Sequence, residues 1–199
     1  RTFGGTDVAS FATLATSLHA AALGINCSAG PAALAALARE LLTLTPLPVM
    51  IKPNAGLPHP QSGLYDLSPD AFANEMLPLA GTGVKLLGGC CGTNNLYIAK
   101  LQGILEGEAY SRPPYIAKGR ICSATRTLTF GDFPLIVGEK LNPTGKPDLQ
   151  DALRNNDYAA YARQAAAQEN AQADILDVNC GLPGIDEAAA MRSAVLAVQ

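Results

Sequence analysis

Residues 83–93 read GVKLLGGCCGT, a short apolar segment that runs into glycines and two adjacent cysteines. The apolar part has the length of a buried β-strand. Two similar segments precede it, LGINCS at 23–28 and PVMIK at 48–52, and the stretches between them space their apolar residues as helices do. Short apolar strands separated by helices are typical of parallel β/α units. The pattern therefore predicts an α/β fold with a parallel sheet.

Each of these three predicted strands ends in a polar, glycine-rich loop, with the sequences NCSAGP, PNAG and GGCCGT. In parallel α/β folds, the loops after the carboxyl ends of the strands form the active face. Cys27 lies in the first loop, whereas Cys90 and Cys91 lie in the third. We therefore expect these three thiols to lie on one rim of the sheet.

The βα pattern is interrupted at 111–134, where paired prolines, scattered charges and β-branched residues predict a linker with a small hairpin. Beyond it the alternation restarts with the strand segments 134–142 and 173–181. A closed (β/α)8 barrel of the TIM type takes roughly 250 residues, so neither part is complete. We expect two incomplete barrels in tandem, at 1–110 and 135–199, and a chain that is a fragment of a longer protein.

The composition is that of a soluble globular protein, with 199 residues, 48% hydrophobic and 16% charged, and a net charge of −3. This balance gives no reason to expect nucleic acid or an anionic membrane as a partner. The chain has neither an apolar run near the ~20 residues of a membrane span nor a signal peptide at its start. A cytoplasmic location is the expectation. In that reducing compartment the five cysteines are expected to be free, metal-bound or catalytic.

Three thiols on one rim suit Zn²⁺, which favours tetrahedral coordination and keeps one position open at catalytic sites. Adjacent side chains on a strand point in opposite directions, so Cys90 and Cys91 can reach one ion only if the backbone turns there. The flanking glycines permit such a turn. The alternatives are a vicinal disulfide, two inert thiols, or a Cys27 that is simply a small buried apolar residue. Cys122 and Cys180 have no partner at ligand spacing and are interpreted as structural.

The motifs GINCSAGP, KPNAGLP and GGCCGT, in this order and spacing, resemble the homocysteine-binding zinc barrel. That domain is shared by cobalamin-dependent methionine synthases and betaine–homocysteine methyltransferases. The later motifs VGEKLNPTG and ILDVNCG resemble the start of the pterin-binding barrel of the methionine synthases. Because the betaine-dependent enzymes lack that second barrel, the tandem points to the cobalamin-dependent family.

The resemblance implies that Cys27, Cys90 and Cys91 bind zinc and that homocysteine binds zinc through its sulfur at the open fourth position. The metal then lowers the thiol pKa, so that a thiolate can attack the methyl group carried by cobalamin. Cobalamin itself is expected on a module outside this chain. Asn54, in the loop on the same predicted rim, is a candidate contact to homocysteine, and a role in the turn is the alternative.

The methyl donor implied by the resemblance is 5-methyltetrahydrofolate, whose pterin ring can be matched by carboxylates and amides. Glu139 and Asn142 match the family's folate-site motif at the end of one strand. Asp177 and Asn179 end the next strand, two positions apart and so on one face. Capping of a following turn or helix is the alternative role for these residues.

Together the motifs predict methyl transfer from 5-methyltetrahydrofolate through cobalamin to zinc-activated homocysteine, which gives methionine and tetrahydrofolate. The expected partners are homocysteine, methyltetrahydrofolate and a cobalamin-binding domain. Two alternatives remain open: a related corrinoid- or betaine-type homocysteine methyltransferase, or a non-catalytic fragment stabilised by zinc. An exchangeable fourth ligand on the metal would favour catalysis, whereas a fourth protein ligand would favour a structural site.

Overall fold

The computed structural model describes residues 1–2, 4–131 and 133–199. The chain forms two compact units, Arg1–Thr129 (unit 1) and Phe130–Gln199 (unit 2). Each unit has a hydrophobic core of its own. None of the helices within the described ranges is long and apolar enough to cross a bilayer.

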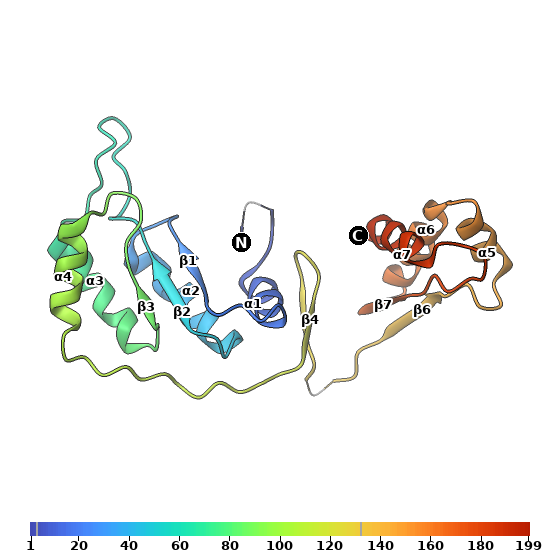
Figure 1. The fold of residues 1–199 in the computed structure, drawn as a ribbon, viewed down its shortest axis with the longest axis horizontal. Helices are drawn as coiled ribbons and strands as arrows, with labels where there is room; N and C mark the ends of the chain where they lie inside the picture. Colours follow the sequence, from blue (N-terminus) through green and yellow to red (C-terminus); the bar gives the residue numbers. More distant parts are fainter. Residues whose placement is uncertain (3, 132) are drawn as a thin grey trace. The chain divides into compact units, whose positions relative to one another are not determined.

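Unit 1 is centred on a three-stranded sheet whose order is β1-β2-β3 and whose strands are all parallel (Figure 1). The strands are β1 (Leu23–Asn26), β2 (Val49–Lys52) and β3 (Leu86–Leu87). The helices are α1 (Val8–Ser17), α2 (Pro31–Leu44), α3 (Pro69–Gly81) and α4 (Asn95–Leu105). Because the three strands are parallel neighbours, the loops that follow them leave the same edge of the sheet.

The core of unit 1 follows from the sequence pattern. In the central strand β2, Val49 and Ile51 are fully buried, as alternation on a strand requires. Helix α2 begins at Pro31, where the missing N–H costs nothing, and buries Leu34 and Leu41 two turns apart. Helix α3 is capped by Ser68, whose side chain accepts a hydrogen bond from the amide of Ala71.

Residues 110–120 run along unit 1 as an extended segment, which we call the strap. The Arg112 guanidinium donates hydrogen bonds to the carbonyls of four residues at the end of α2: Leu42, Thr45, Pro46 and Leu47. These carbonyls have no partner within the helix, and an arginine supplies several donors at once. The strap leads into an antiparallel hairpin, β4 (Arg120–Cys122) and β5 (Thr127–Thr129), as the composition of this segment predicts.

Unit 2 contains one parallel strand pair, with Val137 opposite Ile175. Its elements are β6 (Val137–Leu141), α5 (Pro147–Arg154), α6 (Tyr158–Asn170), β7 (Ile175–Val178) and α7 (Glu187–Val198). Tyr161 is fully buried in its core, and its hydroxyl donates to the carbonyl of Asn179 after β7. Burial raises the pKa of this tyrosine well above its usual range.

The structure bears out the mixed α/β class with parallel strands and differs from the sequence-based expectation in two elements. The apolar residues of 8–22 have helical spacing, which predicts a helix over the whole segment, but α1 ends at Ser17, because His19 adopts a left-handed backbone conformation with φ of 56°. Helix α5 is an eight-residue element that the sequence analysis did not predict.

Candidate metal centre

Cys27 follows β1 in an unusual backbone conformation. Its amide donates to the Lys52 carbonyl at 2.9 Å, which extends the β1–β2 ladder by one bond. Cys27 and Ser28 both have positive φ values, 65° and 70°, and the amide of Ala29 donates back to the Cys27 carbonyl at 2.9 Å. This γ-turn with positive φ at its centre is a strained form. Backbone strain of this kind concentrates at functional sites.

Cys90 and Cys91 lie in a β-turn after β3. The turn is closed by the amide of Thr93, which donates to the Cys90 carbonyl at 3.1 Å, and the Thr93 hydroxyl donates to the same carbonyl at 2.6 Å. Gly92 has φ of 79°, the value that the third residue of a type II turn requires. The turn reverses the strand direction, so that both neighbouring thiols point to the same place.

The three sulfur atoms converge on one point. The Sγ atoms of Cys27 and Cys91 are 3.5 Å apart, those of Cys90 and Cys91 are 3.9 Å apart, and all three lie within 4.8 Å of one another. Four thiolates around zinc at ~2.3 Å would be separated by about 3.8 Å. The donor set and the spacing therefore fit Zn²⁺. All three cysteines are free thiols, which disfavours the vicinal disulfide that the sequence left open.

The thiols are electrostatically coupled. The backbone amide of Ser28, and then the side chains of Cys91 and Cys90, lower the pKa of Cys27. The hydrogen bonds to Cys27 and Cys90 raise the pKa of Cys91. The two neighbouring thiols thus have pKa values shifted in opposite directions. Three thiolates this close repel one another, so a cation is needed to hold them all in the charged form.

Asn54 connects the three loops of the rim. It is only 6% exposed, and its side-chain oxygen accepts a hydrogen bond from the amide of Cys91 at 3.1 Å. Its own amide donates to the Ala29 carbonyl at 2.9 Å, and its side chain helps to lower the pKa of Cys27. Asn54 therefore holds the two cysteine loops in register. Asn54 thus has the role in the turn that the sequence left open, and it also lies beside the sulfurs.

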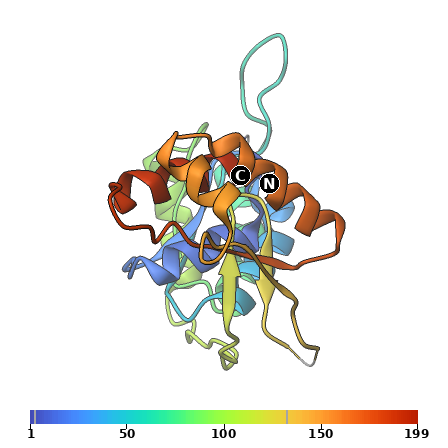
Figure 2. The same cartoon turned by 90° about the vertical axis from the view of Figure 1, so that its right-hand side faces the viewer.

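Tyr65 is a site residue that the sequence analysis missed. It lies on the long loop between β2 and α3, which projects from unit 1 as the teal hairpin in both views (Figures 1 and 2). Its ring packs over Gly92 so closely that a Cβ atom there would overlap it. Desolvation, followed by the neighbouring Cys91 side chain, raises the pKa of Tyr65, so this tyrosine lies close to the sulfurs. No motif in the single sequence marks this tyrosine.

The four candidate folate residues lie at the ends of the parallel strands of unit 2. Glu139 forms an ion pair with Lys146 at 3.2 Å, and this ammonium, followed by the Asn142 amide, lowers the pKa of the carboxyl. Asn142 and Asn179 each accept a hydrogen bond from a backbone amide two residues on, at 3.0 and 2.7 Å. Asp177 is exposed on β7. The two asparagines thus make the turn contacts that the sequence left as an alternative, and their amide N–H groups are additional donors.

Residues 1–105 match the family described as homocysteine S-methyltransferase. The chain is 27% identical over 194 residues to a methionine synthase of Mycobacterium tuberculosis (strain ATCC 25618 / H37Rv), a match that covers 95% of the chain and 16% of the relative. It is 28% identical over 181 residues to a methionine synthase of Mycobacterium leprae (strain TN), and this match covers 86% of the chain and 15% of the relative. The chain therefore spans about one-sixth of the length of these relatives.

Proposed function

Because the chain belongs to the homocysteine S-methyltransferase family, we propose that unit 1 binds one Zn²⁺ through Cys27, Cys90 and Cys91 and presents homocysteine for methylation. The observation that carries this proposal is the convergence of three sulfurs, from two loops 63 positions apart, at the spacing of one tetrahedral ion. Within the described ranges, the cluster consists of these three side chains, which leaves the fourth coordination position to the substrate.

Zinc at this site would supply a Lewis acid that keeps a substrate thiol deprotonated at neutral pH. The residues of the chain prepare the site for it. The Ser28 amide stabilises negative charge on Cys27, and Asn54 fixes the Cys91 loop against the Cys27 loop. Tyr65 covers the turn at Gly92 from the side of the projecting loop.

In the whole protein, the proposed reaction is methyl transfer from 5-methyltetrahydrofolate through cobalamin to homocysteine, with a cobalamin-binding domain as partner. The match to the methionine synthases supports this assignment, because it covers 95% of the chain and thus extends through unit 2. We assign 1–110 to a homocysteine-binding barrel, 111–134 to a linker and 135–199 to the start of a pterin-binding barrel. The parallel strand pairs of both units support this tandem of partial barrels.

For the pterin we propose Glu139, Asn142, Asp177 and Asn179 as binding residues. The parallel β6–β7 pair supports this role, because it puts the ends of both strands next to each other; the amide of Asn179 donates to the carbonyl of Leu141 at 3.0 Å. The lowered pKa of Glu139 keeps this carboxylate charged and able to accept hydrogen bonds from the amino-bearing edge of the pterin ring.

The test measures metal in the purified chain together with Cys27→Ser and Cys90→Ser, with Cys122→Ser as the matched control. We expect one zinc per chain, loss of zinc in the first two variants and full retention in the control. After substitution with Co²⁺, the visible absorption should change when homocysteine is added, because the fourth ligand is exchanged. A spectrum that is indifferent to homocysteine would favour the non-catalytic zinc-stabilised site, and absence of metal in the reduced chain would contradict the zinc site itself.

A further inference from the structure

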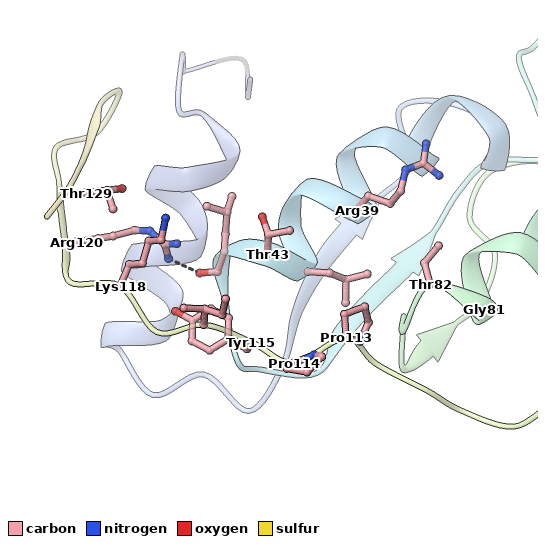
Figure 3. Close-up of a pocket in the computed structure, with 13 residues that line it drawn as sticks. Arg39, Thr43, Gly81, Thr82, Pro113, Pro114, Tyr115, Lys118, Arg120 and Thr129 are labelled. Carbon is pink, nitrogen blue, oxygen red and sulfur yellow. Dashed lines mark hydrogen bonds between the residues drawn. The ribbon is translucent and has the colours of Figure 1, made fainter. Parts of the chain in front are cut away.

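Unit 1 contains a second concave site, at the opposite end of its sheet from the cysteines. A pocket of about 780 Å³ lies between the end of α2, the end of α3 and the strap (Figure 3). Leu44 and Thr82, which line it, precede β2 and β3, so the pocket lies at the amino ends of these strands. Its volume is within the range of ~300–1,000 Å³ that is common for small-molecule sites.

The walls of this pocket are mainly apolar. Leu42 and Leu44 come from α2, and the strap contributes a flat surface made of Pro113, Pro114 and Tyr115. Ile116 lies beside them and is 74% exposed, so its side chain is available to a ligand. The Arg112 contacts to the end of α2 hold the strap against the unit, so these walls are already formed without a ligand.

One end of the pocket is cationic. Lys118 and Arg120 are two positions apart in an extended segment and both line the pocket, and Thr129 lies opposite Arg120 in the β4–β5 hairpin. Figure 3 shows these three side chains at one end, with Arg39 at the other. The ion pairs of the described residues involve other cations: Lys100, Lys146, Arg154 and Arg163. No carboxylate among those residues therefore neutralises Lys118 or Arg120.

Arg120 is only partly satisfied. One of its terminal nitrogens donates to the Leu44 carbonyl at 2.8 Å, whereas its Nε is buried without a hydrogen-bond partner. A buried donor without a partner costs free energy, and two unpaired cations side by side repel each other. An anion bound at this end would remove the repulsion between the two cations.

We propose that this pocket binds a small organic anion from solution, with a carboxylate or phosphate at Lys118 and Arg120 and a flat apolar body along Tyr115 and Ile116. The anionic group of such a ligand needs a cationic surface and its apolar part needs an apolar wall, and the pocket has both. Charge-assisted hydrogen bonds from a guanidinium and an ammonium fix the anionic group, while burial of the body against the strap contributes affinity. The site is separate from the metal centre and does not depend on zinc.

Calorimetric titration of the full chain with 1-naphthyl phosphate tests this proposal, with 1-naphthol and inorganic phosphate as the two half-ligands. We expect 1-naphthyl phosphate to bind at least tenfold more tightly than either half alone. Lys118→Gln should weaken binding roughly fivefold to tenfold, because it removes one charge-assisted contact at a partly solvated site. Arg39→Gln, at the other end of the pocket, is the matched control and should change the affinity less than about twofold.

Ile116→Ser tests the apolar wall at a position too exposed to affect folding. It should weaken binding of 1-naphthyl phosphate and leave the thermal unfolding midpoint unchanged. The titration repeated on Cys27→Ser should give the unchanged affinity, because the metal centre takes no part. Equal binding of 1-naphthol and 1-naphthyl phosphate, equal binding of inorganic phosphate, or an unaltered affinity in Lys118→Gln would each overturn the proposal.

Discussion

Replacement of Asn54 by alanine removes the side chain that connects the two cysteine loops. The lost contact is the hydrogen bond from the Cys91 amide, 3.1 Å long, and the influence of the Asn54 side chain on the pKa of Cys27 is lost with it. Because Asn54 is only 6% exposed, water does not readily replace its oxygen. Removal of one partner of a partly buried hydrogen bond costs about 1–3 kcal/mol.

The effect of the substitution depends on whether this hydrogen bond stabilises the metal-bound chain more than the metal-free chain. If Asn54 orients Cys91 mainly for the metal, the cost appears in metal binding, and about 1.4 kcal/mol corresponds to a factor of ten in the dissociation constant. The expected loss of zinc affinity is therefore about tenfold to a hundredfold, the range usual for residues that support metal ligands. If the contact matters equally with and without metal, the zinc affinity is retained and the metal-free chain unfolds more easily.

The assay is competition for zinc between the chain and a chromophoric chelator, combined with urea unfolding of the metal-free protein. The matched control is Asn142→Ala, which removes a side-chain acceptor from a backbone amide in unit 2 at a similar distance, 3.0 Å. We expect the control to retain its zinc affinity. An Asn54→Ala variant with unchanged zinc affinity and unchanged unfolding would refute the positioning role.

Three further predictions concern the surroundings of the site and the stability of unit 1. Tyr65→Phe keeps the ring over the turn and removes the hydroxyl, so the zinc affinity should fall about twofold to tenfold, whereas urea unfolding should hardly change; an unchanged affinity would contradict the contact to Cys91. Arg112→Ala leaves the carbonyls at the end of α2 without their hydrogen-bond donor, so unit 1 should be destabilised by about 2–4 kcal/mol in urea. A protease should also cleave the strap faster than in the control Lys118→Ala, which replaces an exposed side chain. The pKa of Asp7 is lowered, mainly by the Ser10 amide at the start of α1, so its contribution to stability is complete above its unfolded pKa and is lost as the pH falls through the folded value. Asp7→Asn keeps the cap, and stability between about pH 5 and pH 3 should become less pH-dependent; an identical pH profile would count against this contact.

The parallel strands and the clustering of the three cysteines could be anticipated because their signals are local. Short apolar runs that end in glycine-rich loops predict parallel strands, and the adjacent cysteines already require a turn at Gly92, where the structure has φ of 79°. Helix α5 escaped prediction although Leu149, Ala152 and Leu153 have helical spacing, because eight residues are fewer than the stretch over which such a period is normally recognised. Its stability depends on packing in the core of unit 2, where Leu149 and Leu153 are buried.

The strap and the projecting loop show the other limit of a single sequence. Arg112 lies in a segment rich in proline and charge, which indicates a linker, yet it forms hydrogen bonds to residues 65–70 positions away. Tyr65 similarly reaches Gly92 and Cys91 from a loop that carries no recognisable motif. Contacts of this kind depend on the paths of two distant segments, and neither segment encodes them alone.

The sequence by itself determined the chemistry of this protein: three thiols in two glycine-rich loops at the ends of parallel strands, and the family to which such motifs belong. Residue type and spacing along the chain are local properties, so they can be interpreted without coordinates. Only the tertiary structure decided that the sulfurs lie 3.5 and 3.9 Å apart, that Asn54 holds their loops together, and that a cationic pocket forms behind the sheet. These features depend on burial and on distances between remote segments, which only the folded chain defines.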